Sequence, residues 1–174
     1  MSGTNIPSTP FDGNFKAVLV PAILDVDKPL LSEASAVSAI EASCYFTGDG
    51  LAITVDEQTI TDERLCSTST FEKRGRKTHA IQSTYIDNTN SPAHSEYNAV
   101  REACNEGATH FLITRRNIPF ENEFAEDQLV RVYPIECGFP AEVPAEANSV
   151  TRTTQKWFVT GDPGIDVALV GAGG

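Results

Sequence analysis

A succession of short apolar segments with the patterning of β-strands constrains the fold more than any other feature of this sequence. Residues 51–56, LAITVD, follow a GDG turn and place Leu51, Ile53 and Val55 on one face of an extended chain. Turn-forming Gly, Pro, Asn and Asp residues separate further segments of this kind. These segments are residues 15–22, 78–87, 109–116, 129–137, 149–161 and 165–170. The sequence therefore predicts a mainly β protein.

One segment has helical spacing instead. In residues 91–107, SPAHSEYNAVREACNEG, Ser91 is a natural N-cap, Pro92 occupies the first helical position and Gly107 is a typical C-terminal stop. One apolar stripe is expected at Ala93, Tyr97, Val100 and Cys104. Residues 30–46 are compatible with a short helix followed by a strand. Many strands with one long helix predict a mainly antiparallel sandwich or barrel with one flanking helix.

The polar stretches of the chain set the expected domain limits. Residues 1–14 and 171–174 are rich in Gly, Ser, Thr and Pro, so they are expected to form a flexible N-terminal arm and a flexible C-terminal tail. Residues 15–170 are expected to form a single domain. Within it, residues 57–77 sustain no apolar period and are predicted to be a long polar loop, a type of segment that is usually functional or disordered.

The charge balance argues against proteins that grip nucleic acid. The 174 residues include 13 Lys and Arg against 24 Asp and Glu, a formal net charge of -11. Duplex binding relies on clustered cationic side chains, whereas phosphates are repelled by this composition. Net negative charge also favours solubility. No run reaches the roughly 18 apolar residues of a membrane span, and the N-terminal residues do not resemble a signal peptide, so we expect a soluble, intracellularly made protein.

The four cysteines lie far apart, at Cys44, Cys66, Cys104 and Cys137. Zinc and redox sites are typically indicated by close C-x-x-C pairs, which are missing from this sequence. We expect free, mostly buried thiols, although two disulfides would also satisfy the even count.

No catalytic, cofactor-binding or metal-binding motif emerges. His79, His94 and His110 lack metal-ligand spacing, and there is no nucleophile elbow, Walker A loop or dinucleotide-binding fingerprint. The acidic stretches 25–27, 62–64 and 121–127 do not match a calcium loop. The sequence therefore does not predict an enzyme. A small hydrolase using Asp56, Glu57 or Asp62 is kept as an alternative, which requires a deep pocket with shifted carboxylate pKa values.

Several blocks of the sequence resemble one known family. Residues 47–78, TGDGLAITVDEQTITDERLCSTSTFEKRGRKT, followed by QSTYIDN, YPIECG, AEANSV and QKWFVTG, are similar to the major tail tube proteins of long-tailed, non-contractile bacteriophages of actinobacteria. The similarity extends from about Phe11 to Val170. It implies two packed, roughly orthogonal antiparallel sheets with a flanking helix. It also implies hexameric rings stacked into a hollow tube that delivers the genome, without specific DNA binding, and tape-measure and tail-end proteins as partners.

The resemblance also implies where subunits touch. In the family the long loop and the terminal arms reach neighbouring subunits, so charged residues of the predicted loop become candidate intersubunit contacts. Trp157, the only tryptophan, is a candidate core or interface anchor. The candidate contacts are Asp62, Glu63, Arg64, Arg74, Arg76 and Trp157. A non-polymerising β-sandwich binding module, such as a capsid decoration or tail adaptor protein, is the main alternative.

Overall fold

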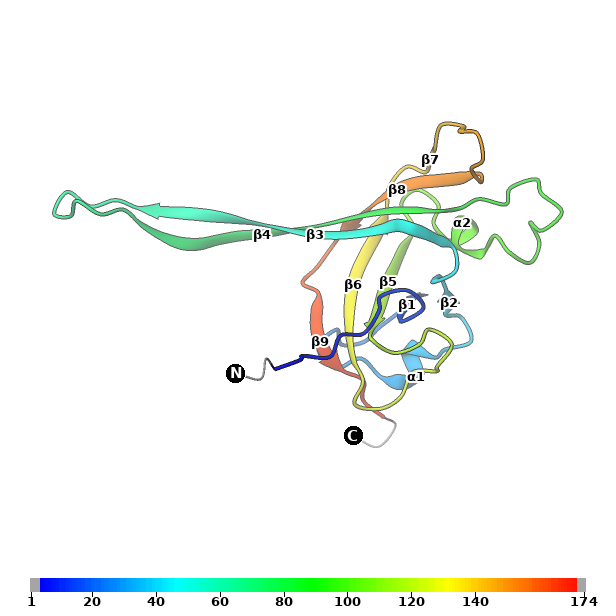
Figure 1. Ribbon diagram of the computed structural model, residues 1–174, viewed down its shortest axis with the longest axis horizontal. Helices are drawn as coiled ribbons and strands as arrows, with labels where there is room; N and C mark the ends of the chain where they lie inside the picture. Colours follow the sequence, from blue (N-terminus) through cyan, green and yellow to red (C-terminus); the bar gives the residue numbers. More distant parts are fainter. Residues whose placement is uncertain (1–3, 172–174) are drawn as a thin grey trace.

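The computed structural model describes residues 4–171 and is mostly β, as the sequence predicts (Figure 1). All the predicted strand segments overlap observed strands, and two-residue strands complete the sheet. The strands are β1 (Phe15–Val20), β2 (Ile40–Glu41), β3 (Phe46–Asp62), β4 (Phe71–Ile86), β5 (Thr109–Arg116), β6 (Leu129–Cys137), β7 (Ala141–Glu142), β8 (Arg152–Val159) and β9 (Gly164–Ala168). The helices are α1 (Leu31–Ala34) and α2 (Ala99–Ala103). The predicted fold class, a β-rich sandwich-like architecture, is confirmed.

All strand pairs are antiparallel and belong to one sheet. Its main order is β2-β1-β5-β6-β8-β4-β3, with β7 added beside β8 and β9 beside β6. The sheet folds over, because side chains of β4 and β8 pack against those of β1 and β5 in one apolar cluster. The result is sandwich-like, although the two layers are joined by continuous hydrogen bonding instead of being separate sheets.

Strands β1, β5 and β6 are buried on both faces. Ala17 and Leu19 of β1 belong to the cluster under β4 and β8, whereas Val18 and Val20 belong to a second cluster with α1 and Leu169. Strands covered on both sides read as continuous apolar runs, which explains the sequences AVLV and FLIT.

Strand β6 changes its neighbour at Pro134. Before the proline, Val132 pairs with Gly164 of β9; after it, Ile135 pairs with Val159 of β8. Proline cannot donate a ladder hydrogen bond, and here it occupies the short interval between the two ladders. Pro134 thus marks a change of partner strand.

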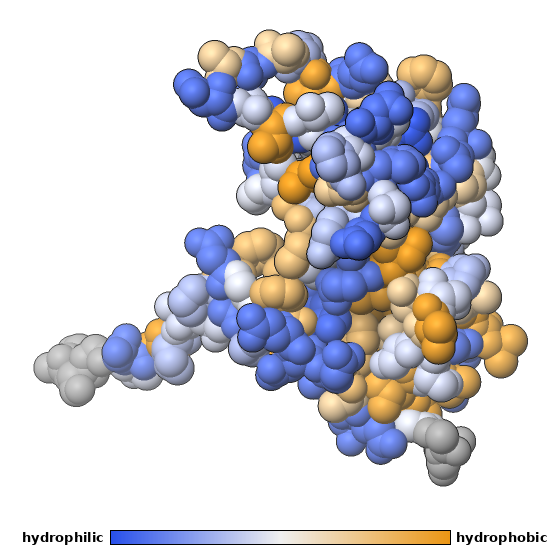
Figure 2. Space-filling model, turned by 90° about the vertical axis from the view of Figure 1, so that its right-hand side faces the viewer, coloured by the Kyte–Doolittle hydropathy of each residue, from blue (hydrophilic) through white to orange (hydrophobic). Residues whose placement is uncertain are grey.

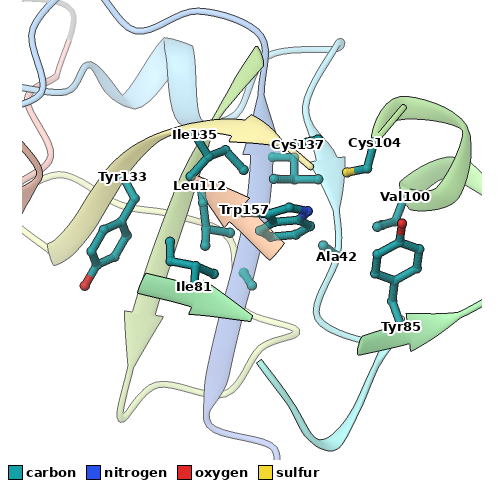
Figure 3. Packing of buried hydrophobic residues seen from close by; sticks show 12 residues of the cluster. Ala42, Ile81, Tyr85, Val100, Cys104, Leu112, Tyr133, Ile135, Cys137 and Trp157 are labelled. Carbon is teal, nitrogen blue, oxygen red and sulfur yellow. The ribbon is translucent and has the colours of Figure 1, made fainter. Parts of the chain in front are cut away.

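A polar network lies inside the main apolar cluster. The Gln155 carbonyl oxygen Oε1 accepts hydrogen bonds from the Tyr85 hydroxyl and the Trp157 indole, each at 3.0 Å. The Gln155 amide Nε2 donates to the backbone oxygens of Cys104 and Gly138 at 2.8 and 2.6 Å. Figure 3 shows Trp157 among aliphatic side chains and Tyr85 pointing toward α2. Every polar group of the Gln155 amide is used, so the network joins β4 and β8 to the residues that directly follow α2 and β6.

The prediction of a long helix over residues 91–107 is wrong. Only Ala99–Ala103 are helical. The Asn98 side-chain oxygen accepts from the Asn88 backbone, and its amide bonds the Thr89 hydroxyl. Such local side-chain hydrogen bonds compete with helix formation. The predicted stripe is buried only at Val100 and Cys104, while Tyr97 is exposed.

Residues 4–14 lie outside the strands and are mostly exposed. In Figure 2 the segment 4–10 forms a slender projection, separated from the upper part of the molecule by a recess. Its last part is held to the body, since the rings of Phe11 and Phe15 stack at 5.2 Å. The ends of the predicted arm and tail, residues 1–3 and 172–174, lie outside the described residues.

The expectation of mostly buried thiols holds for half of the cysteines. Cys104 and Cys137 are buried, whereas Cys44 and Cys66 are exposed, and all four are free. Among residues 4–171, no helix is long and apolar enough to cross a membrane.

Candidate interaction surface

Residues 57–77, predicted as a loop, form a projecting β-hairpin, so that prediction is wrong. Strand β3 continues to Asp62, which pairs with Phe71 at the start of β4, and only residues 63–70 connect them. Figure 1 shows the two strands extending far beyond the rest of the sheet. The alternation of apolar and polar residues that indicates a strand is missing from this part of the sequence, because both faces of the two strands carry polar side chains. Residues 57–77 are called the projecting hairpin below.

The projecting hairpin lacks a core of its own. Nearly all its residues are exposed. Three large apolar side chains, Ile60, Leu65 and Phe71, are 55%, 111% and 56% exposed. A two-stranded hairpin in water is marginally stable unless it packs on something. The exposed apolar residues therefore identify the hairpin as a surface suited to a partner.

Two irregularities shape β3 and β4. One register shift lies between Phe46 and Leu51 at the base, and another between Glu57 and Thr59 in the projecting hairpin. At the second, Glu57 pairs with Lys77 but Thr59 pairs with Arg74. The resulting β-bulge at Gly75 and Arg76 increases the local twist of the hairpin.

Asp62 is the centre of a surface ion-pair cluster at the end of β3. Its carboxylate lies 3.1 Å from Arg64 and 3.2 Å from Lys73. Hydrogen bonds from Arg64 first and Lys73 second hold the pKa of Asp62 below its ordinary value. A general acid requires the opposite shift, so this arrangement does not favour the hydrolase alternative.

The other predicted contacts are distributed along the projecting hairpin. Arg74 pairs with Glu57 at 2.9 Å. Within residues 4–171, Glu63 and Arg76 make no ion pair. The structure therefore brings Asp62 and Arg64 together and separates them from Arg74 and Arg76. Sequence reasoning did not include Lys73 and Glu57 among the contacts, although opposite charges on strands that pair across a turn could have indicated them.

Trp157 does not belong to this surface. It is fully buried, and its ring packs edge-on against Phe46 at 5.9 Å. Trp157 was expected to anchor either the core or an interface. The structure places it in the core, so it is not available as an exposed contact.

A groove lies beneath the base of β3 and β4. It has a volume of about 1020 Å³. Leu51, Ile53 and Val55 form an apolar wall on one face of β3, as the sequence alternation predicts. Aromatic side chains line other parts: Phe11, Phe15, Phe46, Phe120 and Tyr133.

Charged residues of both signs line the groove: Lys77, Arg116 and Arg131 together with Asp12 and Glu57. Arg116 and Arg131 lie 3.2 and 3.0 Å from the same carboxylate, that of Asp166. The hydrogen bond from Arg131 is the main reason why the pKa of Asp166 is lowered. Lys77, another lining residue, makes no ion pair among the described residues. One carboxylate thus balances two guanidinium groups.

Strand β3 is also the edge of the sheet. Among the strands of residues 4–171, its only partner is β4. Free backbone groups along an exposed edge can pair with another chain.

Among the described residues, no group of three or more His, Cys, Asp and Glu side chains could hold a metal ion.

One family model matches nearly the whole chain. Residues 3–172 match the family model described as phage tail tube protein. A search of curated proteins found no match. Among solved structures, the cryo-EM structure of the 6-fold symmetrised anti-feeding prophage (AFP) baseplate contains a similar chain. The two chains are 12% identical, with 91% of this chain and 95% of that chain covered and a TM-score of 0.48.

Proposed function

Because the chain belongs to the phage tail tube protein family, we propose that its copies form hexameric rings that stack into the bacteriophage tail tube, the conduit for genome delivery. Family membership makes it a structural component of the virion tail. The sequence resemblance supports a long non-contractile tail and an actinobacterial host. Assembly then takes place in the host cytoplasm, with tape-measure and tail-end proteins as further partners.

The projecting hairpin is the observation that carries the proposal. It is exposed on both faces, and the side-chain hydrogen bonds and ion pairs described for it lie within it. Exposed apolar residues and a free β3 edge favour association with further protein. A polymer of identical subunits supplies such a partner at every position.

The charge distribution fits a conduit for DNA. Residues 57–77 carry five basic and four acidic residues, whereas the rest of the chain carries eight basic and twenty acidic residues. An acidic body repels DNA phosphates, so the duplex passes without specific binding.

The candidate contacts take different parts in this proposal. Glu63 and Arg76 are exposed and available to neighbouring subunits. Asp62, Arg64 and Arg74 already pair within one chain, and they act by fixing the shape of the hairpin. Surface ion pairs contribute more to partner choice and register than to net affinity. We propose that residues 4–14 of the arm reach a neighbouring subunit on assembly.

Negative-stain electron microscopy across a concentration series, with light scattering on the same samples, tests the function. Rings or tubes with an open channel are expected. Arg76→Glu should shorten the tubes, whereas Lys28→Glu, an equal charge change at an exposed site away from the hairpin, should not. One small species at every concentration would contradict the proposal and favour the capsid decoration or tail adaptor alternative.

A further inference from the structure

We propose that Cys104 and Cys137 form a site of reversible oxidation, a buried dithiol that closes to a disulfide when a low-molecular-weight disulfide reaches it through the turn at residues 105–108. Both cysteines belong to the main apolar cluster, where they are 0% and 1% exposed. Figure 3 shows the Cys104 sulfur pointing toward Cys137. Two nucleophilic side chains thus lie together in the core, away from the projecting hairpin.

A tight turn brings the chain from Cys104 back to Cys137. The Ala108 backbone N–H donates to the Asn105 oxygen at 2.9 Å, and Gly107 adopts a φ of 81°, which favours glycine. Gly107 also donates to the Cys137 oxygen, and Cys137 donates to the Ala108 oxygen, each at 2.8 Å. The backbone of Cys137 is therefore bonded directly to the segment that follows Cys104.

The Gln155 amide holds the same two segments together. Its Nε2 atom donates both to the Cys104 oxygen and to the oxygen of Gly138, the residue after Cys137. One nitrogen atom with two backbone acceptors leaves little freedom in the separation of these segments. A disulfide requires two cysteines on backbones that are already close together, and this arrangement supplies them.

The two thiols differ in acidity because they contact each other. The hydrogen bond with Cys137, followed by burial, raises the pKa of the Cys104 thiol. The hydrogen bond with Cys104 lowers the pKa of the Cys137 thiol, although burial opposes this effect. The thiolate is the nucleophile in thiol–disulfide exchange. Cys137 is therefore the attacking group, and Cys104 reacts second.

The reaction with oxidised glutathione balances as two exchange steps. The Cys137 thiolate attacks one glutathione sulfur, so that a protein–glutathione disulfide forms, the glutathione S–S bond breaks and one glutathione thiolate leaves. Cys104 then loses its proton to solvent and attacks the Cys137 sulfur, which releases the second glutathione thiolate. Two protein thiols are oxidised to one disulfide, and one glutathione disulfide is reduced to two thiols, which take up the two protons.

Entry of the oxidant requires local opening, because both cysteines are covered. The turn is suited to this opening, since Asn105, Glu106 and Gly107 are exposed and the preceding helix α2 has five residues. Segments with few buried contacts open more readily than core strands. Opening of this turn uncovers Cys137 without unfolding the sheet.

The state of the pair follows the surroundings of the protein. Reducing conditions keep thiols free, whereas oxidising media favour disulfides. In a tail subunit, a setting that rests on the proposed function, the pair is a dithiol in the host cytoplasm and a disulfide in the released virion. The cross-link closes a loop over residues 104–137 and constrains the unfolded chain. Oxidation thereby stabilises the subunit outside the cell.

The test uses the full chain with Cys44→Ser and Cys66→Ser, which leaves the buried pair as its thiols. Incubation with oxidised glutathione should remove both free thiols and give a linked pair of tryptic peptides, residues 102–115 and 132–152. The melting temperature should rise by at least about 5 °C and return after reduction with dithiothreitol. Two free thiols that persist in the folded protein, or glutathione that stays attached to either cysteine, would overturn the proposal.

A matched pair of glycine variants tests the route of access. Gly107 and Gly13 both have a positive φ, and a Cβ at either position would meet no atom within 4 Å. Gly107→Ala should speed disulfide formation at least about threefold, because the left-handed conformation strains alanine and favours opening of the turn. Gly13→Ala places the same strain in the N-terminal segment and should leave the rate unchanged. Equal rates in the two variants would overturn the proposal.

These measurements need no assembled protein, so their result is separate from the test of the tube function. Rings or tubes in electron micrographs of protein that yields no Cys104–Cys137 linkage overturn the dithiol site and leave the tube function intact. A disulfide that forms in protein unable to assemble supports the dithiol site and contradicts the tube function.

Discussion

Gly75 approaches the backbone of Gln58 so closely that a Cβ atom at Gly75 would lie 2.7 Å from the Gln58 carbonyl oxygen. This contact occurs at the bulge of the projecting hairpin. It makes glycine a steric requirement at a position where the sequence alone shows only an interruption in the basic run EKRGRK.

Gly75→Ala is expected to destabilise the projecting hairpin locally. Relieving the clash requires the backbone to shift, at a cost of about 1–3 kcal/mol. Amide hydrogen exchange should become faster in residues 57–77 and remain unchanged in β5, because the hairpin does not pack on the core. Gly48→Ala, where a Cβ would meet no atom within 4 Å, is the control. Equal acceleration in β5 would contradict local destabilisation.

Gln155→Leu is expected to lower the free energy of unfolding by about 2–4 kcal/mol. The substitution leaves the Tyr85 hydroxyl and Trp157 indole without their acceptor and two backbone oxygens without their donor. Urea unfolding monitored by tryptophan fluorescence measures the loss. Gln82→Ala removes an exposed amide that bonds Thr154, and it should cost less than about 0.5 kcal/mol. Similar midpoints for both variants would contradict this role of Gln155.

Arg115→Met is expected to release the segment between β5 and β6. The buried Arg115 guanidinium donates to the backbone oxygens of Pro119, Asn122 and Glu123. Without it, these acceptors lose a charged donor, and we expect a stability loss of about 2–4 kcal/mol with faster proteolysis in residues 117–128. Arg116→Met, which removes only a surface ion pair, should cost less than about 1 kcal/mol. Unchanged proteolysis would refute the anchoring role.

The pKa of Asp62 should rise when its partners are removed. Arg64→Ala should raise this pKa more than Lys73→Ala, because Arg64 makes the larger contribution. A lowered carboxyl pKa means that the ion pair contributes above the pKa of the unfolded chain and is lost as the pH falls through the folded value. Carbon-13 NMR titration of the side-chain carboxyls measures the pKa of Asp62 in each variant. Asp166, whose pKa depends mainly on Arg131, should not change and serves as an internal reference.

The sequence predicted those parts of the fold that have a clear period. The alternation of Leu51, Ile53 and Val55 correctly gave one face of β3, and the apolar runs gave β1 and β5. Strand prediction failed where a segment has no buried face and is a strand only because it pairs with a distant segment. Both faces of residues 57–62 carry polar side chains, and no apolar alternation is sustained, so only their pairing with β4 makes them a strand. It also failed where Asn98 side-chain bonds ended the expected helix.

The candidate site shows the same limit. The charged residues of the hairpin were visible in the sequence, but their partners depend on strand register, which a bulge shifts by one residue. Lys73 lies opposite Ile60 and reaches Asp62 diagonally, and Arg74 lies opposite Thr59 and reaches Glu57 diagonally. The groove could not be predicted, because its lining comes from segments as distant as Phe11 and Ile165.

The irregular pairing at the base of β3 has a mechanical consequence. Gly50 lies against the Thr84 backbone at the point where the register shifts, and the hairpin extends outward from there. At about 3.3 Å per residue, Asp62 lies roughly 40 Å from Gly50. Each degree by which the hairpin rotates about Gly50 therefore displaces Asp62 by about 0.7 Å. Small angular adjustments at a few backbone atoms can therefore set the curvature of a large assembly without any change in its contacts.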